Sequence, residues 1–552
     1  MKKFLLSLLF LAFIFIIGYL SMPALLVGNP AIMFIGALVC FAGAGLYHYN
    51  KVAATAFITI GTVFFFVMIL SWIVSWRMFN AEKYYKLIGE VKVRDFEKDV
   101  SPIDQSKIIV IDYETAARLG EKTLVADSAS PVVGSQVVIG EYTLQRVGKE
   151  FYYVAPTLHK SYWKYRRNKG GTPGYIMVNA VNEKDVKYVN NYKIQYQPKA
   201  FFNKNLKRHL YANGYFNVYM IDYSFEVDDN FRPFWVITTY DRTIGISGKE
   251  ANGCIVVDAE TGEISNYSIE ETPDWVDRMQ PVEFVKTQLH DWGDLVEGYF
   301  NFQELNKKRM TDGIVVSYGQ DDRCYYYTGV TSTGSDGATI GFITVDSRTK
   351  EVVMYRKSGA TEDRAMKSAE GAVQEKGYKA SFPRTYNIHG IPTYVMGLKD
   401  KEGLIKSVAM VSVQNYETVA VGETVAKAMR TYKSKLGQFF SDLALSENEN
   451  IKQVQTKVLC CNIDNGISYL HLEEVNKIIV VYIEKFPEAS VTKEGHDVFV
   501  TYFESEDIIS NANHFDNLNL NFYQSEQQKI LNYRLNNPAA TEKDMNLIPN
   551  ND

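Results

Sequence analysis

The segment His159–Lys169, with the sequence HKSYWKYRRNK, is the strongest candidate for a binding site. It alternates basic side chains with aromatic rings, and its candidate site residues are Lys160, Trp163, Lys164, Arg166, Arg167 and Lys169. Basic groups pair with lipid phosphates and rings lie at headgroup depth, so this pattern predicts contact with anionic lipid. The same chemistry suits an anionic polymer or single-stranded nucleic acid. A solvated face of a hairpin or helix is the alternative that requires no ligand.

Residue types that perform catalysis are present, but their spacing does not suit catalysis. The sequence has no GxSxG, HExxH or Walker-type glycine-rich motif. Its eight histidines are scattered, and no two stand three or four residues apart. Asp321 and Asp322 are adjacent in a loop, where carboxylates are usually solvated. We therefore expect a protein that is not an enzyme and has no catalytic residue, no metal and no cofactor; a hydrolase with an unrecognised site is the weakest alternative.

Charge and cysteine usage narrow the class further. The formal net charge is −5, so no global basic field attracts nucleic acid. The five cysteines include no CxxC pair, which argues against a zinc site or a redox pair. Tyrosine is frequent, with 37 residues against 6 tryptophans, and this composition favours strands.

The chain begins with a long apolar run, and this run must hold everything that follows it at a membrane. Lys51 is the only formally charged residue between Lys3 and Arg77. A bilayer core needs about 20 mostly apolar residues per helix, so residues 1–76 predict about three transmembrane helices. A cleaved signal peptide is the alternative for the first of them.

The distribution of basic residues predicts the side on which the chain lies. Lys2, Lys3 and Lys51 favour the cytoplasm, so three crossings would place the bulk of the chain outside a multi-pass cytoplasmic membrane protein. Arg77 and the lysines that follow it favour the inside. Two crossings would make the large region cytoplasmic.

Two stretches of the later chain repeat each other. Cys254–Tyr267 (CIVVDAETGEISNY) aligns with Phe342–Tyr355 (FITVDSRTKEVVMY) at one constant offset. The shared turn residues, to which we assign a structural role, are Asp258, Thr261, Asp346 and Thr349. A helical pattern follows each copy, and degraded copies occupy 408–432 and 174–189. The pattern predicts a ββα unit used several times around a shared core.

The string of strand, VDAETGEI turn, strand and helix resembles the hairpin of PepSY-type domains. The resemblance covers about a third of the chain in pieces, and the second copy departs from it with Lys350 in place of Gly262. It implies binding or inhibitory modules without catalytic residues, outside the cytoplasmic membrane.

The C-terminal part has a different composition. Asp464-Asn465-Gly466 between two apolar runs predicts a tight hairpin, and about five short strands predict a small barrel of the OB or SH3-like kind. This region is acidic, which makes it a poor groove for phosphates.

The expected fold class is α+β, with about three transmembrane helices, repeated ββα modules and a C-terminal small β-barrel. The expected layout is transmembrane helices 1–76, juxtamembrane linker 77–106, N-terminal α+β domain 107–230, PepSY-like repeats 231–436, linker 437–453, small barrel 454–522 and polar tail 523–552.

The function expected from these features is a membrane-anchored, non-enzymatic binding or scaffold protein. Its expected partners are membrane lipid and a protein, a second copy of the chain included; nucleic acid is not expected. The alternative is a cytoplasm-facing anchor that brings nucleic acid, or a replication or transfer complex, to the membrane through the OB-like domain.

Overall fold

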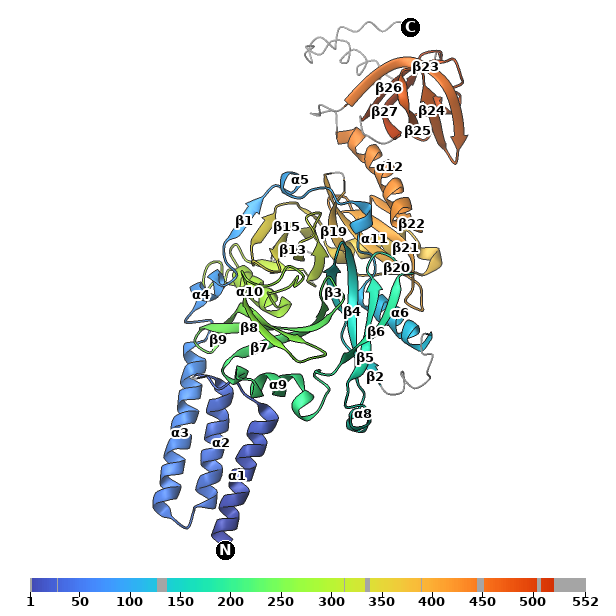
Figure 1. The fold of residues 1–552 in the computed structure, drawn as a ribbon. Helices are drawn as coiled ribbons and strands as arrows, with labels where there is room; N and C mark the ends of the chain where they lie inside the picture. The colour runs from blue at the N-terminus through green and yellow to red at the C-terminus, as the bar shows by residue number, and fades with distance from the viewer. Residues whose placement is uncertain are drawn as a thin grey trace. The chain divides into compact units, whose positions relative to one another are not determined.

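The chain divides into two compact units, Met1–Tyr432 and Lys433–Asp552, coloured along the sequence in Figure 1. The computed structural model describes residues 2–26, 28–126, 137–311, 313–332, 338–388, 390–443, 451–503 and 508–520. The expected polar tail 523–552 lies outside these ranges. Of the expected linker 437–453, the structure describes the end of α12 (Val425–Leu443) and the start of β23.

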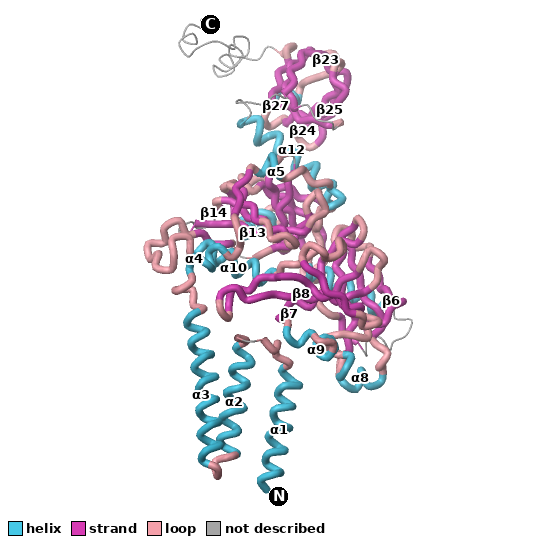
Figure 2. The backbone as a smooth tube through the Cα atoms, turned by 60° about the vertical axis from the view of Figure 1, so that its left-hand side comes forward, coloured by secondary structure: helices cyan, strands magenta, loops and turns pink. Residues whose placement is uncertain are grey.

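Three apolar helices begin the first unit and lie side by side (Figures 1 and 2). They are α1 (Lys2–Ser21), α2 (Pro30–Leu46) and α3 (Lys51–Val74). Asn29 and Asn50 cap α2 and α3 by accepting backbone N–H groups at 3.2 and 3.3 Å. Small residues bring α2 against α3, because a Cβ at Gly61 would lie 3.0 Å from the Cβ of Cys40.

The prediction of about three transmembrane helices, and with it the expected fold class, is wrong. Among the described residues α3 is the one helix long and apolar enough to cross a membrane. The apolar stretch Ser7–Ser21 within α1 and the helix Pro30–Leu46 are shorter, below the length of about 20 residues that a bilayer core requires. The expected number of transmembrane helices was based on the nearly unbroken apolar composition. The lengths of the helices are instead limited by the turns around Pro23 and Pro30.

The rest of the first unit is built from mostly antiparallel sheets and the helices beside them. The first sheet contains β2 (Val137–Ile139), β3 (Thr143–Val147), β4 (Glu150–His159), β5 (Thr172–Asn179) and β6 (Val186–Ile194). The second contains β7 (Tyr219–Val227), β8 (Pro233–Ile244), β9 (Ser247–Asp258) and β10 (Ile264–Ser268). The third contains β1 (Val91–Arg94), β11 (Lys308–Met310), β12 (Val315–Tyr318), β13 (Cys324–Ser332), β15 (Gly341–Asp346) and β16 (Val352–Tyr355). The fourth contains β18 (Lys379–Ala380), β19 (Arg384–Ile388), β20 (Ile391–Lys399), β21 (Ile405–Ser412) and β22 (Val419–Gly422), and β14 (Ala338–Thr339) pairs with β17 (Gly359–Ala360).

Helices precede the sheets that they cover. The longer ones are α6 (Tyr113–Ala126), α9 (Leu206–Ala212), α10 (Val282–Asp294) and α11 (Glu362–Gly371), and the short ones are α4 (Ala81–Lys86), α5 (Phe96–Asp99) and α8 (Tyr162–Arg167). Short 3-10 turns lie at Gln105–Lys107, Phe202–Lys204, Tyr215–Asn217, Gln374–Lys376 and Pro487–Ser490.

The expected ββα grouping is also wrong for the copies at 254–267 and 342–355, because the helix after each copy packs on the sheet that follows that helix. Val285 and Leu289 of α10 share a core with Ile343 of the third sheet. Ala365 of α11 packs in the core of the fourth sheet. For these two copies the structural unit is a helix followed by its sheet, whereas Tyr432 of α12 accepts the Thr393 hydroxyl at 2.9 Å on the sheet that precedes that helix.

Residues 77–106, expected to be a linker, form structured elements of this unit. They hold α4, β1 and α5, and β1 pairs in parallel with β16. This pairing brings the segment after the apolar helices into the third sheet.

The second unit contains a closed five-stranded barrel in the order β23-β24-β25-β27-β26. Its strands are β23 (Ile451–Asp464), β24 (Ile467–Leu472), β25 (Val475–Tyr482), β26 (Asp497–Phe503) and β27 (Ile509–Asn517). Asn465 and Gly466 join β23 to β24 with positive φ angles of 49° and 79°, as a type I′ turn requires. The barrel core contains Leu470, Ile479 and Phe515.

The ion pair between Arg77 and Asp291 gives the first testable prediction. Arg77 follows α3, and its guanidinium lies 2.6 Å from the Asp291 carboxylate on α10, whose side chain is 6% exposed. Asp291→Ala leaves the guanidinium without this partner, so we expect a loss of about 1–3 kcal/mol in the free energy of unfolding. Urea unfolding of the full chain in detergent measures this loss.

Asp294→Ala, which removes the more exposed carboxylate 3.6 Å from Arg77, is the control and should change stability by less than about 0.5 kcal/mol. Equal losses in both variants would contradict the prediction.

Candidate functional site

A cavity of about 340 Å³ lies against the third sheet of the first unit. Its walls come from β13, β15 and β16, from the segment 94–103, from the loop 317–323 and from β19. The lining side chains that matter for its chemistry are Arg94, Phe96, Asp99, Asp321, Arg323, Tyr325, Tyr327, Phe342, Thr344, Asp346, Glu351, Tyr355 and Thr385. This volume is in the range of small-ligand sites.

The segment 94–103 closes one side of the cavity as a strap. Its Phe96 ring is 3% exposed and meets Phe342 and Tyr355 edge-on, with ring centroids 5.3 and 5.5 Å apart. The strap is fixed at one end by the β1–β16 pairing and at the other by Ile103, which donates its N–H to the Asn387 carbonyl at 3.0 Å. An aromatic anchor between two backbone attachments keeps the strap closed.

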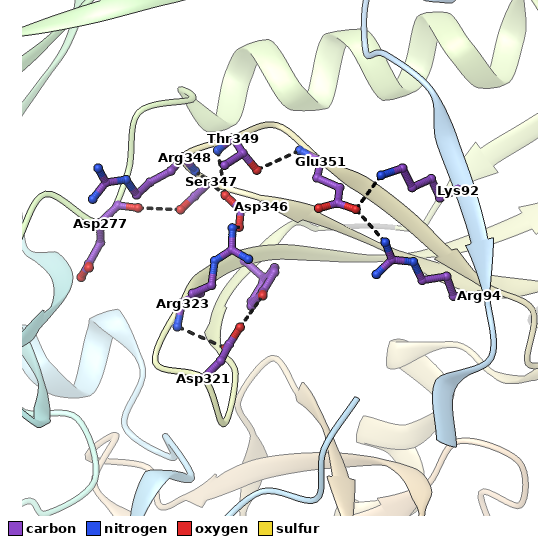
Figure 3. Close-up of polar contacts among 11 residues, drawn as sticks. Lys92, Arg94, Asp277, Asp321, Arg323, Asp346, Ser347, Arg348, Thr349 and Glu351 are labelled. Carbon is purple, nitrogen blue, oxygen red and sulfur yellow. Dashed lines mark hydrogen bonds and ion pairs between the residues drawn. The ribbon is translucent and has the colours of Figure 1, made fainter. Parts of the chain in front are cut away.

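A network of ion pairs forms one rim of the cavity (Figure 3). Glu351 accepts hydrogen bonds from Lys92 at 2.9 Å and from Arg94 at 2.8 Å, both on β1. Arg94 also pairs with Asp99 at 2.9 Å, and Asp99 accepts the Tyr355 hydroxyl at 2.5 Å. The hydrogen bond from Lys92, with both cations nearby, holds the pKa of Glu351 below its usual range. Each of these carboxylates is therefore balanced from within the protein.

The Asp346 turn adjoins this network, because Asp346 donates its N–H to the Glu351 carbonyl at 2.9 Å, and Figure 3 shows Arg323 beside it. One Asp346 oxygen accepts the backbone N–H groups of Arg348 and Thr349 at 2.9 and 2.8 Å, and the other forms an ion pair with Arg323. Thr349 in turn accepts the N–H of Glu351 at 3.3 Å. The side chain of Asp346 is 4% exposed, so its charge is satisfied by amides and one guanidinium.

The first copy of the repeat has the same geometry. Asp258 accepts the N–H groups of Glu260 and Thr261 at 2.9 and 2.7 Å, and its second oxygen lies 2.5 Å from Arg232. Position 262 is glycine because a Cβ there would lie 2.3 Å from the Tyr196 ring. In the second copy Lys350 takes the same left-handed conformation, with φ 64°, and its amine donates to the Leu87 carbonyl at 2.6 Å. The repeat thus conserves its turn chemistry while the second copy uses the extra side chain to join α4.

Two hydroxyl groups in the cavity are not satisfied in this way. Tyr327 is 5% exposed and Thr385 is 9% exposed. Their hydroxyl groups lie near each other, but neither forms a hydrogen bond of standard geometry. Buried polar groups of this kind need a partner, so the cavity offers hydrogen bonds to whatever enters it. By contrast, the Tyr325 hydroxyl donates to Asp321 at 2.8 Å.

This arrangement suits binding. The described lining residues include no histidine, lysine or cysteine, so the cavity walls do not pair a nucleophile with a nitrogen base. No group of three His, Cys, Asp or Glu side chains able to hold a metal occurs in the described ranges. Aromatic walls, paired charges and two hydroxyls that have only each other as neighbours of poor geometry would receive an uncharged group that forms hydrogen bonds.

Two buried carboxyls behind the hairpin have raised pKa values. Burial raises the pKa of Asp277 to about 6, although its carboxylate accepts the Arg146 N–H at 2.6 Å and the Tyr318 hydroxyl at 2.7 Å. Burial raises the pKa of Glu226 to about 7. Burial also raises the pKa of the nearby Cys324 thiol, which makes it a poor nucleophile. Asp277 joins β3 to β12, and none of the three groups lines the cavity.

The basic-aromatic segment predicted from the sequence lies elsewhere, on α8 and its flanks. Lys160, Trp163, Arg166, Arg167 and Lys169 are exposed and Lys164 is half-buried. The side chain of Trp163 is 66% exposed. None of these residues lines the cavity, so the structure contains two separate candidate sites.

The cavity itself was not predicted. The turn residues Asp346 and Thr349 were recognised, but Arg94, Arg323 and Glu351 were not assigned a role. One signal was available, because Glu351 occupies the position of Glu263 in the first copy and Arg323 precedes the tyrosine run 325–327. The pairing of residues 91–94 with 352–355 leaves no mark in the sequence.

Comparison with known proteins adds little to this geometry. The sequence matches no family model and no curated protein. A crystal structure of an ACO/RPE65 chimera aligns over 50% of this chain and 47% of its own chain, at 9% sequence identity and a TM-score of 0.14. A TM-score this low does not indicate a shared fold. The PepSY-type resemblance stays a prediction.

The buried Glu226 gives a pH-dependent prediction. Its folded pKa of about 7 lies above the ordinary 4.5, so the folded chain binds this proton more tightly than the unfolded chain. The resulting stability is complete below about pH 4.5 and is lost as the pH rises through about 7. Glu226→Gln keeps the group neutral, so at pH 8 we expect the variant to be more stable than the wild type by about 2–3 kcal/mol.

The measurement is urea unfolding at pH 5 and at pH 8. The difference between variant and wild type should shrink towards zero at pH 5. Glu270→Gln, at an exposed position, is the matched control and should show no such trend. A variant less stable than the wild type at pH 8 would refute the assignment.

Proposed function

We propose that this chain is a membrane-anchored, non-enzymatic binding protein, and that the cavity beside the Asp346 turn is its ligand site. The observation that carries the proposal is that each charged side chain of the lining already has a partner within the protein, Asp321 having the Tyr325 hydroxyl. Arg94, Asp99, Glu351, Arg323 and Asp346 all pair with one another or with neighbours on the same walls. A charged ligand would have to break these pairs, whereas an uncharged one would not.

The hydroxyls of Tyr327 and Thr385 refine the ligand class. They favour a small uncharged group that donates and accepts hydrogen bonds, such as an amide or hydroxyl-bearing side chain of a protein partner. The rings of Phe96, Phe342 and Tyr355 would pack against its apolar part.

The anchor in this proposal is α3, and the bulk of the chain lies on the extracytoplasmic side. Lys2 and Lys3 favour a cytoplasmic N-terminus. Lys51 begins α3 and also favours the cytoplasm, so a crossing by α3 carries the residues after Val74 to the other side. The acidic barrel region disfavours the alternative of a cytoplasmic nucleic-acid anchor.

Filling the cavity should abolish binding. Thr344 lines the cavity from β15, so Thr344→Phe occupies its volume. The probes are N-acetyltyrosine amide, which is uncharged, and citrate and spermidine, which are charged. In saturation-transfer NMR on the full chain in detergent, we expect signal from the uncharged probe and a fall of at least severalfold in Thr344→Phe.

Thr331→Phe, on the same strand system but outside the lining, is the control and should keep the signal. The unfolding midpoint of each variant shows whether the fold is retained. Stronger signal from citrate or spermidine than from the amide, or equal signal in a folded Thr344→Phe, would overturn the ligand assignment.

Native Cys460 reports the side of the membrane. It is exposed, whereas Cys40, Cys254 and Cys324 are buried. After mild reduction of intact cells, we expect a membrane-impermeant maleimide to label the wild-type chain, and Cys460→Ser to lose most of the label. Labelling that requires permeabilised cells would place the bulk of the chain in the cytoplasm.

A further inference from the structure

We propose that a surface around α8 rests on the anionic headgroup layer of the same membrane that α3 crosses. This surface, the α8 patch, consists of Lys160, Tyr162, Trp163, Lys164, Arg166, Arg167, Lys169 and Phe202. It is separate from the cavity, so the proposal is independent of the ligand assigned there.

The aromatic part of the patch is exposed and contiguous. Trp163 is 66% exposed and Phe202 is 55% exposed. Tyr162 joins them, with its ring centroid 5.4 Å from Trp163 and 6.3 Å from Phe202. Phe202 also has a positive φ of 55°, which a phenylalanine rarely adopts, and it still presents its ring to solvent. Rings held outward in this way suit the interface between water and lipid.

Buried residues give the patch a rigid base. Tyr165 is 6% exposed, and its ring contacts His159 at 5.2 Å and Phe201 at 5.5 Å between centroids. Phe201 also contacts Tyr162 at 5.1 Å. The exposed rings therefore project from a packed support.

The basic side chains of the patch are left unbalanced. No acidic residue occurs between Phe151 and Asn182, nor between Val186 and Ile221. Among the described residues, none of the patch lysines or arginines lies within 4.0 Å of a carboxylate, unlike the arginines of the cavity. Unpaired basic groups beside exposed rings are complementary to anionic headgroups.

The position of the patch identifies the lipid surface as its partner. The neighbouring helix α9 is bonded to the end of α1: Lys207 donates to the Ser21 carbonyl at 3.2 Å, and the Arg208 guanidinium lies 4.4 Å from the Tyr19 ring centroid. Leu25 donates its N–H to the Phe216 carbonyl at 2.6 Å. In Figures 1 and 2, α8 and α9 lie on the side of the first unit that faces α1–α3. This is the level at which the apolar helices end, where headgroups must lie.

Hydrogen–deuterium exchange of the full chain in nanodiscs tests the proposal. One set of discs contains phosphatidylcholine alone and the other adds phosphatidylglycerol. We expect the amides of residues 160–169 to exchange at least threefold more slowly in the anionic discs. Lys164→Glu combined with Arg167→Glu should abolish this difference.

Lys98→Glu is the matched control, because Lys98 is an exposed lysine on α5, on the side of the unit away from α1–α3. It should keep the difference. Unchanged exchange in β4 and β5 shows that each variant is folded. Equal exchange in the two kinds of disc overturns the proposal, as does a difference that survives the double charge reversal. Protection by a single-stranded oligonucleotide but not by phosphatidylglycerol would reassign the patch to nucleic acid.

Discussion

The junction between α3 and the β-rich part of the first unit fixes how the other features of that unit lie relative to α3. Ser75 follows α3; its hydroxyl accepts the Ile246 N–H at 2.9 Å, and its carbonyl accepts the Tyr84 hydroxyl at 2.7 Å. Gly245 allows this approach, because a Cβ there would lie 2.2 Å from the Ser75 hydroxyl and its φ is 59°. With the ion pair of Arg77 added, the helix cannot swivel freely beneath the sheets. Because this junction is fixed, the surface near α9 stays close to the membrane that α3 is proposed to cross.

The same junction continues towards the cavity. The chain passes from α3 through α4, whose end is bonded to Lys350 of the Asp346 hairpin, and then into β1 and the strap. The cover of the cavity is thus made from the first residues after the apolar helices, although its floor is formed some 250 residues later. One continuous segment therefore joins the end of α3 to the strap of the cavity.

Local chemistry was predictable from the sequence, and long-range pairing was not. The Asp-x-x-Thr spacing located two turns at which Asp258 and Asp346 accept neighbouring amides. The apolar composition predicted the helices correctly, but it predicted too many membrane-spanning ones, because composition does not fix where a helix ends. The cavity depends on the contact of residues 91–94 with 352–355, and the helix grouping depends on which sheet lies within reach. Neither leaves a periodicity for sequence reasoning to detect.

The charged side chains of the cavity have partners within the protein, whereas those of the α8 patch have no carboxylate partner among the described residues. This difference favours different ligands at the two candidate sites. Arg94 and Arg323 lie at a partly enclosed cavity, where an unpaired guanidinium would be costly, and both have carboxylate partners on the walls. Arg166 and Arg167 are exposed, where water solvates an unpaired charge and no local partner is required. A site whose charges are already satisfied gains from an uncharged guest. A surface whose cations are solvated gains when an array of phosphates replaces the counterions. The two proposed tasks, contact with a lipid surface and selection of an uncharged ligand, therefore use different residues.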